Sequence, residues 1–188
     1  MKWFFTLGLA FFISQGIAQE NSNSFDVQVN VAVVNSRFHV QASYSLPINI
    51  CSAYAFITDY EGSKNIPGIV EAKVISRAGN KVRVYRVIEE QILFFPIEMK
   101  STVEYTELPD RSLTFEQISG DTKSYKGTWK LSEEKDKTVF KYDAQIEPNS
   151  IIPLAIIEYF IKNSMRERFE SMAQRASEYK AIQAFACK

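Results

Sequence analysis

The amino-acid sequence predicts an α+β fold in which a curved antiparallel sheet of six to seven strands wraps around one long C-terminal helix. Three observations lead to this prediction. Apolar and polar residues alternate through most of residues 27–146, which is typical of β-strands. The links between the alternating segments are short, and short links join antiparallel neighbours. After residue 153 the apolar spacing changes to three and four residues, which indicates a helix.

The strand segments are bounded by turn residues. Residues 27–33 and 38–46 are expected to form a hairpin around Asn35-Ser36, and Pro47 ends the second strand. Residues 50–60 predict a short helix with Asn49 as its N-cap, and a second brief helix or turn follows at 61–65. The remaining segments read as a meander, with strands at about 69–77, 82–93, 97–108, 112–119, 123–132 and 137–146.

The C-terminal helix, expected at residues 153–179, is apolar on every side near its start. One stripe at spacings of three and four contains Leu154, Ile157, Ile161, Met165, Phe169, Met172, Ala176 and Tyr179. Ile156 and Phe160 fall outside this stripe, so the helix needs an apolar neighbour on a second side. A single helix about 10 Å wide cannot fill the concavity of a strongly curved sheet. We therefore expect the helix to close a hydrophobic cavity.

The period of two assigns an inner face to the meander. This face contains Ile97, Met99, Val103, Tyr105, Leu113, Phe115, Gln117, Tyr125, Trp129, Leu131, Phe140, Tyr142, Ala144 and Ile146. Glu98, Lys100, Thr102 and Glu104 alternate with the first of these residues and indicate a solvated outer face. The inward aromatic residues are either plain core or the wall of the cavity.

The expected cavity predicts a set of ligand-binding residues. The apolar body of a ligand would contact Met99, Val103, Tyr105, Phe115, Trp129, Tyr142, Ile157, Ile161 and Met165, and its polar end would contact Gln117, Tyr125 or Arg86. Arg86 and Glu90 share one strand face. A surface ion pair between them is the favoured interpretation, and contact with a polar ligand head is the alternative.

Composition and motifs argue against several classes of function. The chain has 22 basic and 22 acidic residues, so it shows no basic excess that would attract nucleic acid. His39 is the only histidine and is expected on the outer face, which argues against a Ser-His-Asp triad. No metal or redox motif is present, because there is no CxxC pair. We predict no catalytic residues, no bound metal and no cofactor.

Residues 1–18 predict a signal peptide, and residues 19–188 a single mature domain. Lys2 precedes an uncharged apolar run that ends in Gly16-Ile17-Ala18, which suits cleavage by a signal peptidase near Ala18. We expect a secreted or periplasmic protein. Cys51 and Cys187 would then reach an oxidising compartment, where they either pair or remain a buried thiol and a terminal thiol.

The order of these elements resembles the helix-grip fold of the START-like SRPBCC superfamily, and most closely its polyketide cyclase/dehydrase and coenzyme Q-binding branch. The resemblance covers residues 38–179, the core of the domain. It rests on Pro47, Tyr54-Ala55-Phe56, Asp59-Tyr60, Ile66-Pro67-Gly68, Ile118-Ser119-Gly120-Asp121, Tyr125 and Gly127-Thr128-Trp129. It implies two short helices after the first strand, and a Cys51–Cys187 disulfide between the first of them and the C-terminal tail.

The resemblance implies a protein that binds a hydrophobic small molecule more than any one reaction. A secreted binder or carrier of a lipid, quinone or polyketide-like compound is the main hypothesis. A cyclase or aromatase that stabilises an enolate with cavity Tyr and Arg groups is the first alternative. An interaction module whose cavity is filled by its own side chains is the second.

Two apolar runs fall where loops are expected. Phe94 and Phe95 precede a proline at a strand junction, and Ile151 and Ile152 precede the last helix. Such loops are either tucked into their own core or form a rim that contacts a membrane transiently while a lipid passes.

Overall fold

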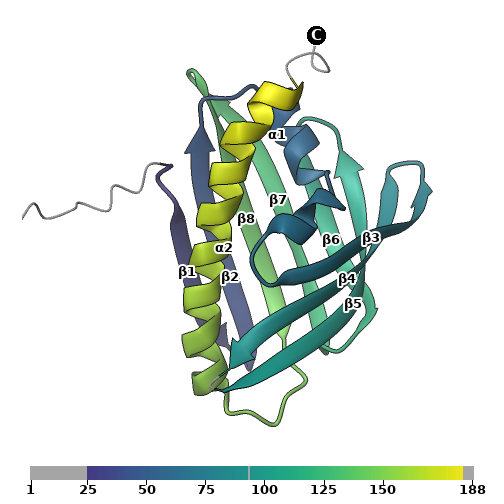
Figure 1. The fold of residues 1–188 in the computed structure, drawn as a ribbon, viewed down its shortest axis with the longest axis vertical. Coiled ribbons are helices and arrows are strands. Elements are labelled where there is room, and N and C mark those ends of the chain that lie inside the picture. The colour runs from purple at the N-terminus through teal and green to yellow at the C-terminus, as the bar shows by residue number, and fades with distance from the viewer. Residues whose placement is uncertain (1–24, 93, 184–188) are drawn as a thin grey trace, which may run out of the picture.

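Eight antiparallel strands form one curved sheet that wraps around a long C-terminal helix (Figure 1). The computed structural model describes residues 25–92 and 94–183. Its elements are β1 (Gln28–Val34), β2 (Arg37–Leu46), α1 (Ile50–Ile57), the 3-10 helix η1 (Gly62–Asn65), β3 (Ile69–Ala78), β4 (Lys81–Ile92), β5 (Phe95–Leu108), β6 (Ser112–Gly120), β7 (Ser124–Glu134), β8 (Lys137–Glu147) and α2 (Leu154–Gln183). The predicted signal peptide lies outside the described residues.

The strand order is β1-β2-β8-β7-β6-β5-β4-β3. β2 pairs with β8, so the first hairpin is added to the end of the meander. The sheet therefore has one strand more than the predicted maximum of seven, because both strands of the hairpin join it. For the same reason the two short helices follow the second strand and not the first.

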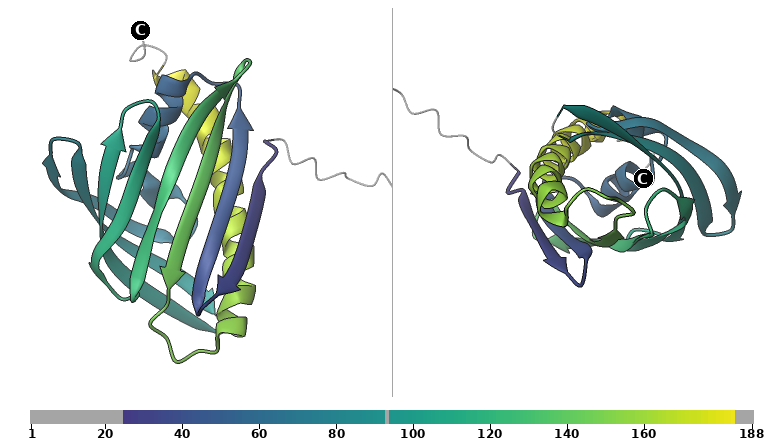
Figure 2. Two further views of the ribbon diagram at one scale, coloured as in Figure 1. Left: turned by 180° about the vertical axis from the view of Figure 1, so that it is seen from behind. Right: turned by 90° about the horizontal axis from the view of Figure 1, so that it is seen from below.

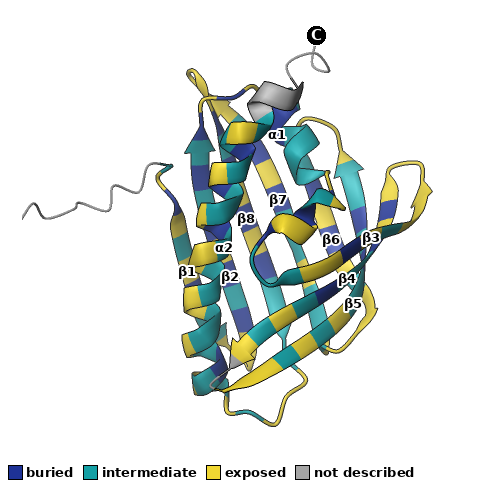
Figure 3. Ribbon diagram, in the orientation of Figure 1, coloured by how far each residue is buried: buried dark blue, intermediate teal, exposed yellow. Residues whose placement is uncertain are grey.

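The predicted inner face is the buried one. Trp129 pairs with Tyr142 on one side and with Leu113 on the other, and all three side chains are buried. The exposed positions alternate with buried ones along the strands (Figure 3). Phe115 pairs with Gly127, where an added Cβ would lie 2.6 Å from the Phe115 ring. The missing side chain thus makes room for an aromatic ring on this face.

Local hydrogen bonds explain the short helices and one of the turns. Asn49 caps α1 as predicted, because its side chain accepts from the Ser52 amide at 2.7 Å. Asp59 accepts from the Gly62 amide at 3.0 Å and so fixes the start of η1. Asp121 accepts from the Lys100 amide at 2.7 Å, so it bonds the neighbouring strand β5 and not the backbone of its own turn.

α2 covers the concave face of the sheet and contacts β1, β2 and α1 (Figures 1 and 2). Its distal half packs closely, because Ala173 and Ala176 are fully buried and the ring of Tyr179 lies 5.6 Å from that of Phe56 on α1. In its proximal half, Ile161 and Met165 are only partly buried. Residues from both halves of α2, from Ile157 to Tyr179, line the space beneath the helix.

One charged side chain ties α2 to the opposite half of the sheet. Arg168 forms an ion pair with Glu90 on β4 at 2.6 Å and donates from Nε to the Pro67 carbonyl at 2.8 Å. Gly68 has a φ of +79°, and a Cβ there would overlap the Arg168 guanidinium. We call these contacts of Arg168 with Glu90 and Pro67 the Arg168 clasp. The side chains of Arg168 and Glu90 are 11% and 15% exposed, so the ion pair is largely shielded from water.

Candidate functional site

A cavity of about 600 Å³ lies between α2 and the concave face of the sheet. Its wall is formed by β2 to β8, α1, η1, α2 and the loop before α2. The view from below shows α2 and the curved sheet around this region (Figure 2, right). The volume falls within the range of small-molecule sites, which is roughly 300 to 1,000 Å³.

The structure brings eleven of the twelve predicted ligand-binding residues to this cavity. They are Arg86, Met99, Tyr105, Phe115, Gln117, Tyr125, Trp129, Tyr142, Ile157, Ile161 and Met165. Val103 is the exception. It is fully buried in the core cluster with Val82 and Val84, because its short side chain does not extend to the cavity surface.

Several lining residues were not predicted as ligand contacts. Ile88 on β4, Phe56 on α1, Ile66 and Ile69 beside η1, and Arg168 on α2 line the cavity. Ile88 shares the strand face of Arg86, so the period of two contained a signal for it. The face that α1 turns to the cavity depends on how the helix packs, and local sequence carries no signal for that.

One cluster of polar groups in the cavity wall consists of Arg86 and three tyrosines, which pack with Phe115. Arg86 donates from Nη1 to the Tyr105 hydroxyl at 2.6 Å, and its guanidinium carbon lies 5.3 Å from the centroid of that ring. The hydroxyls of Tyr125 and Tyr142 are 3.0 Å apart, and both rings pack against Phe115. Arg86 Nε is buried and has no hydrogen-bond partner among the described residues.

The predicted Arg86–Glu90 ion pair is wrong. Glu90 pairs with Arg168, and Arg86 turns to Tyr105. Both side chains line the cavity, so this strand face is the inner one. Gln117 also lines the cavity, but its amide donates to the Thr122 carbonyl at 2.8 Å and accepts from the Thr122 hydroxyl at 2.7 Å. Both ends of the Gln117 amide are therefore engaged within the protein, whereas Arg86 and the tyrosines keep donors that can face a ligand.

Burial keeps the phenols of Tyr105 and Tyr142 protonated. It raises the pKa of Tyr105 and of Tyr142 well above the usual value for a phenol, and the positive charge of Arg86 lowers both in part. At neutral pH these groups are neutral hydrogen-bond donors. Because they keep their protons, they cannot accept one from a substrate as general bases.

Next to residues 148–150, which line the cavity, lies an apolar rim, which we define as Phe94, Phe95 and Ile151. Phe94 is 90% and Phe95 is 69% exposed, and Ile151 is fully exposed. The β4–β5 turn and the loop before α2 lie at the same end of the molecule (Figures 1 and 2). Ile152, also predicted for this rim, is partly buried and packs against the core. The tips of the two apolar runs are therefore exposed to solvent, whereas Ile152 packs against the core.

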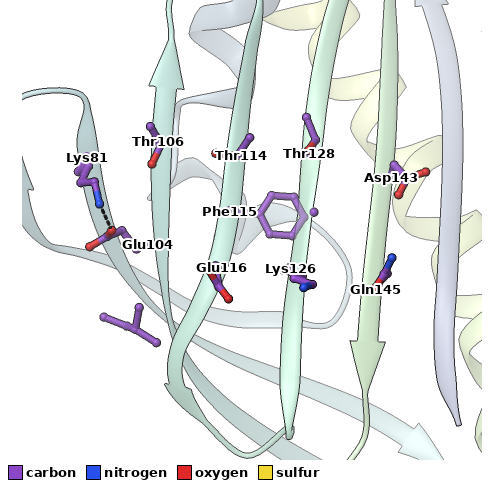
Figure 4. A pocket seen from close by; sticks show the side chains of 12 residues that line it. Lys81, Glu104, Thr106, Thr114, Phe115, Glu116, Lys126, Thr128, Asp143 and Gln145 are labelled. Atoms are coloured by element: carbon purple, nitrogen blue, oxygen red, sulfur yellow. Dashed lines mark hydrogen bonds and ion pairs between the residues drawn. The ribbon is translucent and has the colours of Figure 1, made fainter. Parts of the chain in front are cut away.

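A second hollow of about 450 Å³ lies on the outer face of the sheet (Figure 4). Thr106, Thr114 and Thr128 occupy neighbouring positions on three strands there. Glu104 hydrogen-bonds Lys81 at 2.6 Å and Arg83 at 2.9 Å, and these two bonds lower its pKa. The lining of this hollow is mainly polar, whereas that of the inner cavity is mainly apolar, so the inner cavity is the better candidate site for a hydrophobic ligand.

Other features of the described residues bear on the predicted site chemistry. Cys51 is disulfide-bonded. Cys187 lies outside the described residues, so the Cys51–Cys187 pairing stays a prediction. Within residues 25–92 and 94–183, no cluster of His, Cys, Asp or Glu side chains could hold a metal ion. No helix in the described part of the chain is long and apolar enough to span a membrane.

Comparison with known proteins agrees with this architecture. The sequence profile of the family described as polyketide cyclase/dehydrase and lipid transport matches residues 46–173. The chain belongs to this family. The predicted resemblance to the START-like SRPBCC superfamily is thereby confirmed. No curated protein sequence matches the chain.

Solved structures of three other proteins share the fold of this chain. A protein from Thermus thermophilus has a TM-score of 0.66 and 20% identity, over 78% of this chain and 99% of its own. The Zhui aromatase/cyclase from Streptomyces has a TM-score of 0.64 and 11% identity, over 79% and 98%. A STAR-related lipid transfer protein from Xanthomonas axonopodis has a TM-score of 0.62 and 9% identity, over 79% and 98%. At these identities the likeness shows the fold alone.

We predict that Tyr142→Phe makes the stability of the protein less sensitive to high pH. Below about pH 10 the phenol is neutral in both the folded and the unfolded chain, so the folded state keeps its full stability. Above that pH the unfolded chain ionises while the folded chain does not, which lowers the free energy of unfolding. Between about pH 9 and pH 11, the free energy of unfolding measured with urea should fall by about 1.4 kcal/mol less in the variant than in the parent.

The control for this measurement is Tyr159→Phe, because Tyr159 is 65% exposed on α2. This variant should keep the pH dependence of the parent. Equal pH dependence of Tyr142→Phe and the parent would contradict the raised pKa.

Proposed function

We propose that this protein binds and carries a hydrophobic small molecule, such as a lipid, a quinone or a polyketide-like compound, in its internal cavity. The single observation that carries the proposal is the cavity of about 600 Å³ itself, with apolar side chains on most of its wall and one cluster of polar donors. Preformed apolar pockets with a few convergent polar groups are typical of small-molecule sites. Membership of a family described by both lipid transport and polyketide cyclisation supports this choice.

A cyclase-type reaction is the second candidate. The Arg86–Tyr105 pair favours it, since two donors in a dry cavity would stabilise an enolate. Forming an enolate also requires a base, and burial raises the pKa of Tyr105 and Tyr142, which leaves them neutral at neutral pH. Glu90 is engaged by Arg168. Binding therefore accounts for the cavity better than catalysis does.

A cavity filled by its own side chains is the weakest of the three hypotheses. About 600 Å³ remains open after every described side chain has been placed. Natural cores leave few voids larger than a water molecule. A space of this size beneath α2 supports a ligand more than a self-packed core.

We further propose that the apolar rim contacts a lipid surface. Phe94, Phe95 and Ile151 lie at the tips of two neighbouring loops, where their exposure has no structural benefit to the folded chain. Ile97 on β5 and Pro148 after β8, which follow and precede the rim residues in sequence, line the cavity. A lipid that leaves a membrane at the rim would thus pass directly into the cavity.

The carrier function predicts that Ile161→Trp folds but loses its ligand. Ile161 lines the cavity from α2, so the larger side chain would occupy space that the ligand uses. We expect a melting temperature within a few degrees of the parent, and mass spectrometry of organic extracts should show that the native ligand is lost. If the cavity were self-filled, the added bulk would instead destabilise the core by roughly 1 to 3 kcal/mol.

The matched control is Tyr159→Trp, which adds an indole to the exposed side of the same helix. It should carry as much extracted ligand as the parent. A folded Ile161→Trp protein that retains the parent's ligand content would refute the cavity as the binding site.

The rim predicts weaker membrane binding for the double variant Phe94→Ser/Ile151→Ser. Each side chain buries apolar area only when the protein sits on a lipid surface, so its loss should weaken binding without unfolding the protein. We expect about a tenfold smaller bound fraction in sedimentation with vesicles of phosphatidylethanolamine and phosphatidylglycerol. Val70→Ser/Leu108→Ser removes two apolar side chains that are 54% and 53% exposed outside the rim, and it should bind like the parent.

We also propose that the protein is exported, with its mature N-terminus at Gln19 and a disulfide between Cys51 and Cys187. The apolar run before Ala18 and the bonded state of Cys51 support this proposal. Intact-mass measurement of the protein from the extracytoplasmic fraction should give residues 19–188, lighter by two hydrogen atoms before reduction than after it. Full-length protein with two reactive thiols in the cytoplasm would rule the proposal out.

A further inference from the structure

Arg86 is a cation in the cavity wall that has no carboxylate partner among the described residues. Its hydrogen bond goes to a neutral phenol, Tyr105, and its Nε is buried without an acceptor. Two arginines of α2, Arg168 and Arg175, also line the cavity, and Arg168 is paired with Glu90. A guanidinium that is taken out of water without an anion is costly, so this position is suited to a counter-ion that comes with the ligand.

The groups around Arg86 are also arranged as donors. The Tyr105 hydroxyl accepts from Arg86, which leaves its own proton for another acceptor. One hydroxyl of the Tyr125–Tyr142 pair donates to the other, so one proton of that pair is also left over. A positive charge with several convergent O–H and N–H donors complements an anionic oxygen.

The strand register connects this cluster to the apolar rim. Arg86 pairs with Ser101, Ile88 with Met99, and Glu90 with Ile97, and the β4–β5 turn follows. The side chains of Ile88, Met99 and Ile97 line the cavity between Arg86 and the turn, and Ile161 and Met165 line it from α2. Six residues of strand separate Arg86 from Ile92, which is about 20 Å. A largely apolar path of this length, which passes the Glu90–Arg168 ion pair, suits an extended acyl chain.

We infer that the ligand is an amphiphile whose singly charged oxyanion head pairs with Arg86 and whose acyl chain follows β4 and β5 to the apolar rim. This inference deepens the proposed carrier function and rests on it. A carboxylate is the head that one uncompensated guanidinium balances, and two parallel N–H···O bonds from Nε and one Nη fit its geometry.

The first experiment needs no variant. Binding of dodecanoate, dodecyl phosphate, dodecanol and dodecylamine to the delipidated protein is measured by isothermal titration calorimetry at neutral pH. The four probes share one chain and differ in the head. We expect dodecanoate to bind about tenfold more tightly than dodecanol, and dodecylamine to bind more weakly than either. Tighter binding of dodecyl phosphate than of dodecanoate would assign the site to a phosphate head and overturn the carboxylate.

The second experiment tests the role of Arg86 directly. Arg86→Met keeps an unbranched side chain and removes the charge, and it should abolish the preference for dodecanoate while dodecanol binding stays within about twofold. Arg83→Met removes an exposed arginine from the outer face of the same strand and should keep the preference of the parent. If Arg86→Met does not fold, Tyr105→Phe serves, because it removes the hydroxyl that orients Arg86 and should reduce the preference in the same direction.

The outcomes separate the two levels of the proposal. Equal affinities for dodecanoate and dodecanol, or equal weakening of both by Arg86→Met, would overturn the anionic head and leave the carrier function standing. Failure of all four probes to bind, together with the absence of any extracted lipid, would overturn the carrier function itself.

Discussion

The fold depends on one mismatch of size. Eight strands form a concave apolar face, and one helix about 10 Å wide covers it. Small buried residues, Ala173 and Ala176, let the distal half of α2 lie close to its neighbours. In the proximal half, the longer side chains of Ile161 and Met165 face an open space. The cavity is therefore a consequence of covering a wide sheet with a single helix, and residues from both halves of α2 line it.

Most of this architecture could be predicted from the sequence, because the signals for it are local. The observed strand bounds agree with the alternation of residues to within about two positions, and period two placed Tyr105, Trp129 and Tyr142 on the inner face. Local signals did not determine which strands form the end of the sheet that contains β1 and β2. Whether the first hairpin joins the meander depends on the pairing of β2 with β8, which brings together residues about 100 positions apart.

The charged contacts of the cavity could not be predicted. Arg86 and Glu90 share a strand face, which favoured a pair between them, yet Glu90 is bound by Arg168 from a helix 78 residues further along the chain. The position of Arg168 relative to β4 is set by the packing of α2 on α1, β1 and β2. No local pattern encodes such a contact. The same holds for Phe56, whose place in the cavity wall depends on the orientation of α1.

The Arg168 clasp also explains how an uncompensated cation can persist on this strand. Glu90 lies four residues from Arg86 on the same face, and as a free carboxylate it would attract Arg86 and repel an anionic ligand in the path to it. Arg168 neutralises Glu90 at 2.6 Å, and its second bond, to the Pro67 carbonyl, holds the guanidinium in that position. Gly68 permits this approach because it has no Cβ. The Arg168–Glu90 ion pair that fastens α2 to β4 thus also leaves the Arg86 guanidinium free to pair with a ligand anion. The charge that the cavity offers to a ligand therefore depends on the contact that holds the helix over the sheet.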